Sequence, residues 1–195
     1  MDFTPVDSAN EERTIEILAE CFADDPVMNW SCNHPSTLVP FFEITLEPFL
    51  QHNLSYLDKE ERGAAVWLGP NQKLQWSYRP SNVWKMLSLG GMKGVYRMAR
   101  SGMVTEKYHP SEPHYYLFAI GALPSARGQG VGSSLISHVL RRCDDEGMPA
   151  YLENSKERNL GFYQGHGFEV MREIRFAKSA PPLWLMWRKP RDLNA

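Results

Sequence analysis

The stretch that decides the fold is residues 115–140, YYLFAIGALPSARGQGVGSSLISHVL. It begins with a continuous apolar run, Tyr115 to Ile120, which predicts a central strand buried on both faces. It ends with apolar residues at helical spacing between Val131 and Leu140, which predict an amphipathic helix. A glycine-rich turn joins the two. The stretch therefore predicts a strand, a tight turn and a helix, the building unit of an α/β domain.

The turn itself predicts an anion-binding site. Residues 127–133 read RGQGVGS, and glycines let backbone N–H groups approach a ligand without interference from a Cβ atom. The helix that begins here points its unpaired N–H groups and the positive end of its dipole at the same place. Arg127 adds a fixed charge and Ser133 adds a hydroxyl donor. This combination favours a phosphate or a pyrophosphate as the ligand.

Two common nucleotide-binding motifs fit the turn less well. The P-loop ends in Gly-Lys-Ser/Thr, which this turn lacks. The dinucleotide fingerprint G-x-G-x-x-G fails at its third glycine, where the chain has Ser133. Glu153 nevertheless lies roughly where that fold places an acidic residue, about 20 residues further on. A nicotinamide-dinucleotide enzyme therefore stays open as an alternative.

The composition narrows the class of protein. The chain has 195 residues, of which 43% are hydrophobic and 23% charged, as in an ordinary globular domain. A formal net charge of -2 argues against nucleic-acid binding. The chain has neither a signal-peptide pattern nor an apolar run of the roughly 20 residues that span a bilayer. Few, widely spaced cysteines and histidines without ligand spacing predict a reduced, cytoplasmic protein with no bound metal.

The flanking sequence predicts helices before the central strand and more strands after it. A first helix ends at Pro26, which has no N–H to continue it, and a second is expected near residues 35–50. Residues 81–103 predict a basic helix whose apolar side covers the core, the alternative being a surface that touches a membrane or nucleic acid. A short helix is expected at 160–164. Strands are expected at residues 54–57, 64–68, 150–152, 168–176 and 183–188.

Two motifs of this sequence occur together in a known superfamily. Arg127-x-x-Gly130-x-Gly132 is similar to the R/Q-x-x-G-x-G/A pyrophosphate loop of the GNAT N-acetyltransferases. Residues 159–168, NLGFYQGHGF, look like the N-x-x-F/Y-Y-x-x-x-G-F segment that closes the acetyl-CoA site in that superfamily. The chain therefore resembles a GNAT N-acetyltransferase.

Shorter stretches are similar to the puromycin N-acetyltransferase-like branch of this superfamily: GAAVW at 63–67, HPSEP at 109–113 and WLMWR at 184–188. The resemblance implies an α/β fold with a mixed, mostly antiparallel central sheet, a splayed pair of parallel strands and flanking helices. It also implies a single domain over 1–195. In that domain 1–62 lie on the acceptor side, and 63–188 form the acetyl-CoA-binding and catalytic core.

The resemblance further implies the reaction. A primary amine of a small molecule attacks acetyl-CoA directly in a ternary complex, and no metal takes part. The expected partner is thus a small-molecule amine, with no nucleic acid and no membrane, and the protein is a monomer or a homodimer. The residues implied to hold acetyl-CoA are Ile120, Gly121, Ala122, Arg127, Gly128, Gln129, Gly130, Val131, Gly132, Ser133, Asn159 and Phe162.

The catalytic residues follow from the same resemblance. Tyr163 matches the position whose phenol protonates the departing CoA thiolate. Two residues are candidates for the base that deprotonates the amine: Glu153, at a strand end beside the splay, and His114. An ion pair between Glu153 and an arginine is the structural alternative. Asp25, Trp30 and His114 are expected to bind the acceptor, although an Asp-Pro turn explains Asp25 equally well.

A non-catalytic sensor or partner module that binds acetyl-CoA is the alternative function. Such a module would keep the anion-binding turn and lose the chemistry. The presence of both Tyr163 and Glu153 argues against it.

Overall fold

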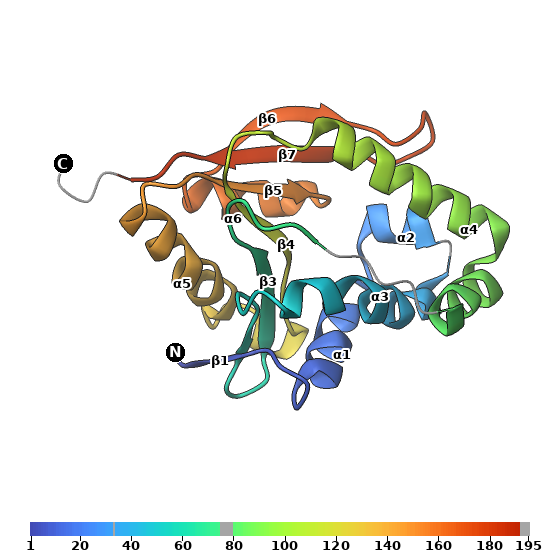
Figure 1. Ribbon diagram of the computed structural model, residues 1–195, viewed down its shortest axis with the longest axis horizontal. Coiled ribbons are helices and arrows are strands. Elements are labelled where there is room, and N and C mark those ends of the chain that lie inside the picture. The colour runs from blue at the N-terminus through green and yellow to red at the C-terminus, as the bar shows by residue number, and fades with distance from the viewer. Residues whose placement is uncertain (33, 75–79, 192–195) are drawn as a thin grey trace.

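The computed structural model describes residues 1–32, 34–74 and 80–191, which form a seven-stranded sheet in the order β1-β2-β3-β4-β5-β7-β6 (Figure 1). Neighbouring strands are antiparallel except for β4 and β5, which are parallel. This confirms the predicted mixed, mostly antiparallel sheet. It also excludes the dinucleotide-binding alternative, which requires a mostly parallel sheet. The strands are β1 (Phe3–Pro5), β2 (Tyr56–Asp58), β3 (Gly63–Leu68), β4 (Tyr115–Ala122), β5 (Ala150–Asn154), β6 (Glu169–Ile174) and β7 (Leu183–Arg188).

The parallel strands β4 and β5 separate partway along their length. Their pairing ends at Leu117 and Leu152, whereas β4 continues to Ala122 beside β3 alone. Phe118 is an extra residue in β4, because the partners of Leu117 and Ala119 are consecutive residues of β3. Such a bulge bends a strand and increases its local twist. The result is the expected splay, a V-shaped opening between two parallel strands.

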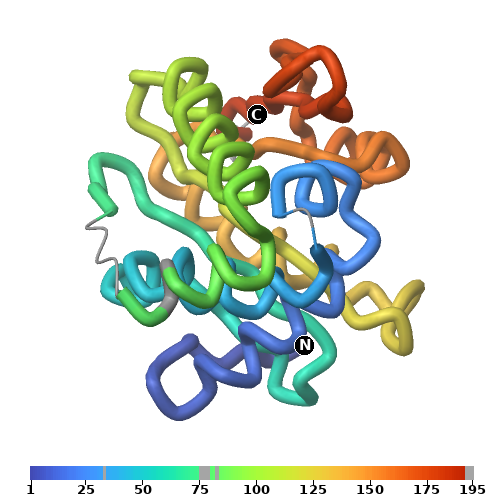
Figure 2. The backbone as a smooth tube through the Cα atoms, turned by 90° about the vertical axis from the view of Figure 1, so that its right-hand side faces the viewer, coloured from blue at the N-terminus to red at the C-terminus, as the bar shows by residue number. Residues whose placement is uncertain are grey.

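Helices cover both faces of this sheet (Figures 1 and 2). One face carries α5 (Val131–Asp145) and α6 (Leu160–Gly165). The other face carries α1 (Glu11–Cys21), α2 (Pro26–Cys32), α3 (Leu38–Leu50) and α4 (Pro80–Tyr108), and α4 lies beside α2. Among the described residues, short 3-10 turns complete the helical segments at Pro35–Thr37, Pro124–Ala126 and Glu157–Asn159.

The side chains of β3 show how the two layers are held. Ala65 and Trp67 belong to the core beneath α5, and Ala64 and Val66 belong to the core beneath α1 and α3. All four are 0% exposed. Successive side chains of a strand point to opposite faces, so a strand covered on both sides is apolar throughout.

The predicted basic helix is α4, and it bends at Gly91, whose φ of 64° suits a residue without a Cβ atom. Met86 is buried, which places part of the helix against the core. Met92, Tyr96 and Met103 remain exposed along its outer side. No helix in the described part of the chain is long and apolar enough to cross a membrane.

The N-terminal segment contains two elements that the sequence pattern does not predict, β1 and α2. Pro26 ends α1 as expected but also begins α2. A proline loses no hydrogen bond at the first position of a helix, so one residue serves as a stop and as a start. The short turn between α1 and α2 carries Asp24 and Asp25 toward the opening between β4 and β5.

Candidate active site

The opening between β4 and β5 contains a cavity of about 700 Å³. Its walls come from five segments that are far apart in the sequence. They are the unpaired part of β4, the glycine-rich turn, the end of β5 with the loop after it, α6, and the turn between α1 and α2. The splay thus brings together the segments that the two sequence motifs contribute.

One end of the cavity is the turn that leads into α5. Gly128 and Gly130 have φ values of 76° and 78°, a conformation that favours glycine. A Cβ atom on either would meet nothing within 4 Å, so the cradle is open. The N–H of Ser134 donates to the Gly130 carbonyl at 2.9 Å, which leaves the N–H groups of residues 131–133 without helical partners. These donors and the exposed Arg127 fit the pyrophosphate of a nucleotide-type ligand.

Tyr163 lies on α6 and lines the cavity. Its side chain is 8% exposed and packs between the rings of Phe162 and Phe168. Burial, and to a smaller degree the negative charge of Asp25, raises the pKa of its phenol. The phenol therefore keeps its proton at physiological pH and is available as a hydrogen-bond donor.

Glu153 reaches the same cavity from the end of β5, and its side chain is 9% exposed. Its Oε2 accepts a hydrogen bond of 2.7 Å from the Tyr116 hydroxyl. Its Oε1 has no hydrogen-bond partner among the described residues and lies 3.8 Å from Nδ1 of His109. Burial and the adjacent carboxylate raise the pKa of Tyr116 well above its usual value. Glu153 is thus held by a tyrosine and faces a histidine, and within the described ranges it pairs with no arginine.

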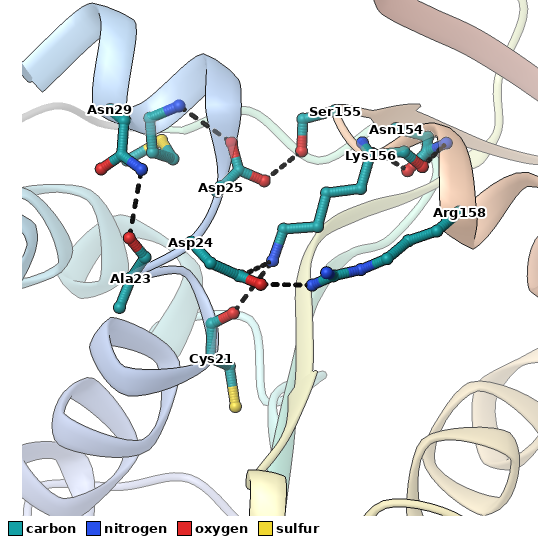
Figure 3. A network of polar contacts seen from close by, with 10 residues as sticks. Cys21, Ala23, Asp24, Asp25, Asn29, Asn154, Ser155, Lys156 and Arg158 are labelled. Atoms are coloured by element: carbon teal, nitrogen blue, oxygen red, sulfur yellow. Dashed lines mark hydrogen bonds and ion pairs between the residues drawn. The ribbon is translucent and has the colours of Figure 1, made fainter.

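A polar network joins the turn between α1 and α2 to the loop after β5 (Figure 3). Asp24 pairs with Lys156 and Arg158, a set we call the Asp24 clasp. Hydrogen bonds from these two cations lower the pKa of Asp24 to about 2. Asp25 is 1% exposed and accepts hydrogen bonds from the Ser155 hydroxyl and from a backbone N–H of α2. Both aspartates therefore hold the turn against the β5 loop at the cavity.

The cavity includes most of the residues expected to hold acetyl-CoA. Gln129 is the exception, because its side chain turns back and donates to the Ser125 carbonyl at 3.0 Å. The lining set is Ile120, Gly121, Ala122, Arg127, Gly128, Gly130, Val131, Gly132, Ser133, Asn159 and Phe162.

The three residues expected to bind the acceptor lie in different places. Asp25 lines the cavity, but Trp30 and His114 are not part of its lining. The Arg97 guanidinium stacks on the Trp30 ring, 4.5 Å from the ring centroid. His114 is buried behind the cavity, where it contacts His109. The sequence alone indicates which helix, strand or loop a residue belongs to. Whether Trp30 and His114 reach the cavity depends on how α2 and the loop before β4 pack.

The sequence pattern does not predict several residues of the cavity wall, among them Cys21, Phe22, Lys156 and Arg158. Cys21 is the last residue of α1, and the other three lie in the segments that follow α1 and β5, where no motif marks them. Tyr116 carries a weak signal, because the parallel pairing of β4 with β5 places it opposite a residue two positions before Glu153. In the described part of the chain, no group of three His, Cys, Asp or Glu side chains could hold a metal ion.

Comparison with known proteins agrees with this geometry. Residues 91–168 match the Acetyltransferase (GNAT) family. An uncharacterized N-acetyltransferase of Schizosaccharomyces pombe is 23% identical over 205 residues, which cover 95% of this chain and 82% of that protein. A crystal structure of histone acetyltransferase HPA2 and related acetyltransferase from Corynebacterium glutamicum has a TM-score of 0.69 and 25% identity, covering 99% of this chain and 98% of that one. Arylalkylamine N-acetyltransferase 2 of Aedes aegypti shares the fold, with a TM-score of 0.62 and 15% identity over 97% and 99% of the two chains.

The splayed sheet and the anion-binding turn, taken with these relatives, define the class as an acetyltransferase. The family match over residues 91–168 and these relatives support a GNAT N-acetyltransferase, and enzymes of that family use acetyl-CoA.

Proposed function

We propose that this protein transfers the acetyl group of acetyl-CoA to a primary amine of a small molecule, by direct attack in a ternary complex. The observation that carries the proposal is that Glu153 and Tyr163 line one cavity. A buried carboxylate that accepts hydrogen bonds and a phenol that keeps its proton thus face the same space. Amide formation from an amine and a thioester needs one group of each kind.

The shape of the cavity supports the binding of acetyl-CoA. The N–H groups at the start of α5, with Arg127, hold the pyrophosphate. The edge of β4 at residues 120–122 faces the opening without a partner strand and binds the pantetheine arm. Asn159 and Phe162 form the opposite wall. Gln129 takes part through its backbone alone, since its side chain turns away.

The chemistry requires three groups of the chain. Acetyl-CoA supplies an activated thioester carbonyl. A backbone N–H near Ala122 donates to the oxygen of that carbonyl as negative charge develops on it, and such a donor contributes about 3–4 kcal/mol. Glu153 accepts a proton from the attacking amine. Tyr163 donates a proton to the departing thiolate, a role that its raised pKa supports by keeping the phenol protonated.

The acceptor side of the cavity belongs to the first 62 residues, which contribute Cys21, Phe22 and Asp25. Both oxygens of Asp25 already accept hydrogen bonds within the chain, but its buried negative charge favours a positively charged substrate, so we assign Asp25 to acceptor binding through its charge. The narrower hypothesis of a puromycin N-acetyltransferase-like enzyme rests on the short stretches 63–67, 109–113 and 184–188. Puromycin is therefore the first amine to test.

The test is a panel of primary amines, puromycin included, mixed with the protein and acetyl-CoA. We expect CoA thiol to be released only when an amine is present, with one acetylated amine formed per thiol. Calorimetry on the same samples measures the binding of acetyl-CoA. Tight binding without thiol release for any amine would overturn the proposal and indicate a CoA-binding module instead. Release with other amines but not with puromycin would remove the puromycin hypothesis alone.

A further inference from the structure

Behind Glu153 the structure places two histidines in a row. Oε1 of Glu153 is 3.8 Å from Nδ1 of His109, and Nε2 of His109 is 3.1 Å from Nε2 of His114. Nδ1 of His114 lies 2.6 Å from the backbone carbonyl of Glu112. The side chain of His109 is 27% exposed, whereas His114 is 8% exposed. The row therefore places a partly exposed ring directly beside the buried carboxylate of the cavity and a buried ring behind it.

The carbonyl at the end of the row determines where the hydrogen atoms lie. A carbonyl oxygen only accepts, so Nδ1 of His114 carries a hydrogen and donates it to Glu112. Burial lowers the pKa of His114, so near neutral pH its ring is uncharged and its Nε2 is bare. The hydrogen between the two rings then belongs to Nε2 of His109. An uncharged His109 of this tautomer turns a bare Nδ1 toward Glu153.

Two lone pairs consequently face each other between His109 and Glu153. Their separation of 3.8 Å is longer than a hydrogen bond, and Oε1 makes no hydrogen bond within the described ranges. The hydroxyl of Tyr151, which also lacks a hydrogen-bond partner there, lies near the same carboxylate. A buried oxygen without a partner is costly. One added proton would turn this contact into a charge-assisted hydrogen bond. The contact between His109 and Glu153, the candidate base, thus lacks the proton that a hydrogen bond needs.

The proposed reaction supplies that proton. An alkylammonium ion and a thioester give an amide, a thiol and one free proton. Nitrogen loses two protons as the C–N bond forms, the electron pair of the broken C–S bond goes to sulfur, and one of the two protons ends on that sulfur. The other must leave the site once per turnover. Glu153 is nearly buried and His109 is not, so the histidine is the better exit.

We propose that His109 and His114 are positioning residues: His109 takes over the proton accepted by Glu153 and passes it to solvent, and His114 holds the tautomer of His109. The proton moves from Oε1 of Glu153 to Nδ1 of His109. The resulting imidazolium is stabilised by the carboxylate on one side and by the bare Nε2 of His114 on the other. His109 then gives the proton on its Nδ1 to water, which restores the starting tautomers. This inference rests on the proposed function, because it takes Glu153 as the base.

The groups around the two rings bear on any pH dependence. Two are tyrosines whose pKa burial raises, so they stay neutral, and the others are carboxyl groups. The set is Tyr116 on β4, Tyr151 and Glu153 on β5, Glu106 in the last turn of α4, and Glu112 in the segment that leads from α4 to β4.

The tautomers are testable in the protein without any ligand. Long-range ¹H–¹⁵N NMR near pH 8, where an ordinary histidine is neutral, distinguishes which ring nitrogen carries hydrogen. We expect hydrogen on Nδ1 of His114 and on Nε2 of His109. The opposite tautomer on either ring would overturn the relay, because Nδ1 of His109 would no longer be free to accept.

The kinetic test compares His109→Gln with His52→Gln, a histidine substitution at the end of α3 and away from the site. With His109→Gln we expect kcat on the pH plateau to fall by about tenfold or more, the size of effect that general-base chemistry allows. The KM for acetyl-CoA should stay unchanged. The acid limb of the kcat profile should move to lower pH, because the extra proton is then held by Glu153 alone.

A structural role for His109 would lower the rate equally at every pH, so an unmoved acid limb overturns the relay. The control His52→Gln should keep both the rate and the limb, and a shift there would also count against the relay. Failure of the proposed function is distinguishable, since the wild-type protein would then release no thiol with any amine. If the wild type turns over but the acid limb of the kcat profile does not move in His109→Gln, the relay is refuted and the proposed function stands.

Discussion

Replacing Tyr163 with phenylalanine removes one oxygen atom from the wall of the cavity. The ring keeps its contacts with Phe162 and Phe168. The hydroxyl makes no hydrogen bond within the described ranges, so its loss leaves no partner unsatisfied. We therefore expect the free energy of unfolding to change by less than about 1 kcal/mol. The effect on turnover has a different origin.

A general acid contributes about 10²–10⁴-fold to the rate. A phenol is a weak acid for a thiolate whose conjugate acid has a pKa near 8.5, and burial raises the pKa of Tyr163 further. The contribution of Tyr163 to the rate therefore lies at the lower end of this range. For Tyr163→Phe we expect kcat to fall by about 100-fold, or about 3 kcal/mol, while the KM for acetyl-CoA changes by less than about twofold.

The assay follows CoA thiol release at several acetyl-CoA concentrations, with thermal unfolding measured on the same samples. Tyr96→Phe on the exposed side of α4 is the matched control and should leave kcat unchanged. An equal loss of kcat and of acetyl-CoA affinity in Tyr163→Phe would assign the hydroxyl to binding, and no loss would refute the role altogether. The raised pKa adds a check. The Tyr163 phenol ionises near pH 10 in the unfolded chain and at a higher pH in the folded protein. The free energy of unfolding should therefore decline above pH 10 in the wild type and decline less in Tyr163→Phe.

Three further predictions concern the walls of the cavity. Glu153→Gln keeps an oxygen for the tyrosine that holds it but loses the base, so kcat should fall by about 100-fold or more in the thiol assay; an unchanged kcat would place the base elsewhere. In Gly121→Ala the new Cβ would stand 2.5 Å from Cβ of Cys21, so α1 must shift. Urea unfolding should show a loss of about 1–3 kcal/mol that Cys21→Gly partly restores, and full stability would contradict the packing. Asp24→Asn leaves the two cations of the Asp24 clasp unpaired beside an anionic ligand, so calorimetry should show tighter acetyl-CoA binding at about 0.02 M salt and little difference at about 0.3 M. The Asp24 side chain is 49% exposed and Lys156 keeps its hydrogen bond to the Cys21 carbonyl, so stability should change by less than about 1 kcal/mol; weaker binding would show that these cations do not face the ligand.

The sequence by itself determined the central part of the fold. The run from Tyr115 to Leu140 specifies a buried strand, a turn and a helix because the apolar period changes from continuous to helical across three glycines. Positive φ at Gly128 and Gly130 is a local requirement that glycine meets, so the anion-binding turn is readable from the chain. The segment 159–168 is equally local, and Tyr163 lies where the motif implies, on a short helix at the cavity.

The tertiary structure alone decided what surrounds the candidate base. The hydroxyl that holds Glu153 comes from Tyr116, 37 residues earlier, and the histidine that faces its free oxygen follows α4. The Asp24 clasp joins residues 132 and 134 positions apart. Hydrophobic periods and turn residues report local conformation and burial, but they do not say which distant strands pair or which loops meet. The bulge and splay of the β4–β5 pair determine which residues meet at the cavity, because pairing in register brings side chains from separate segments onto one face of the sheet.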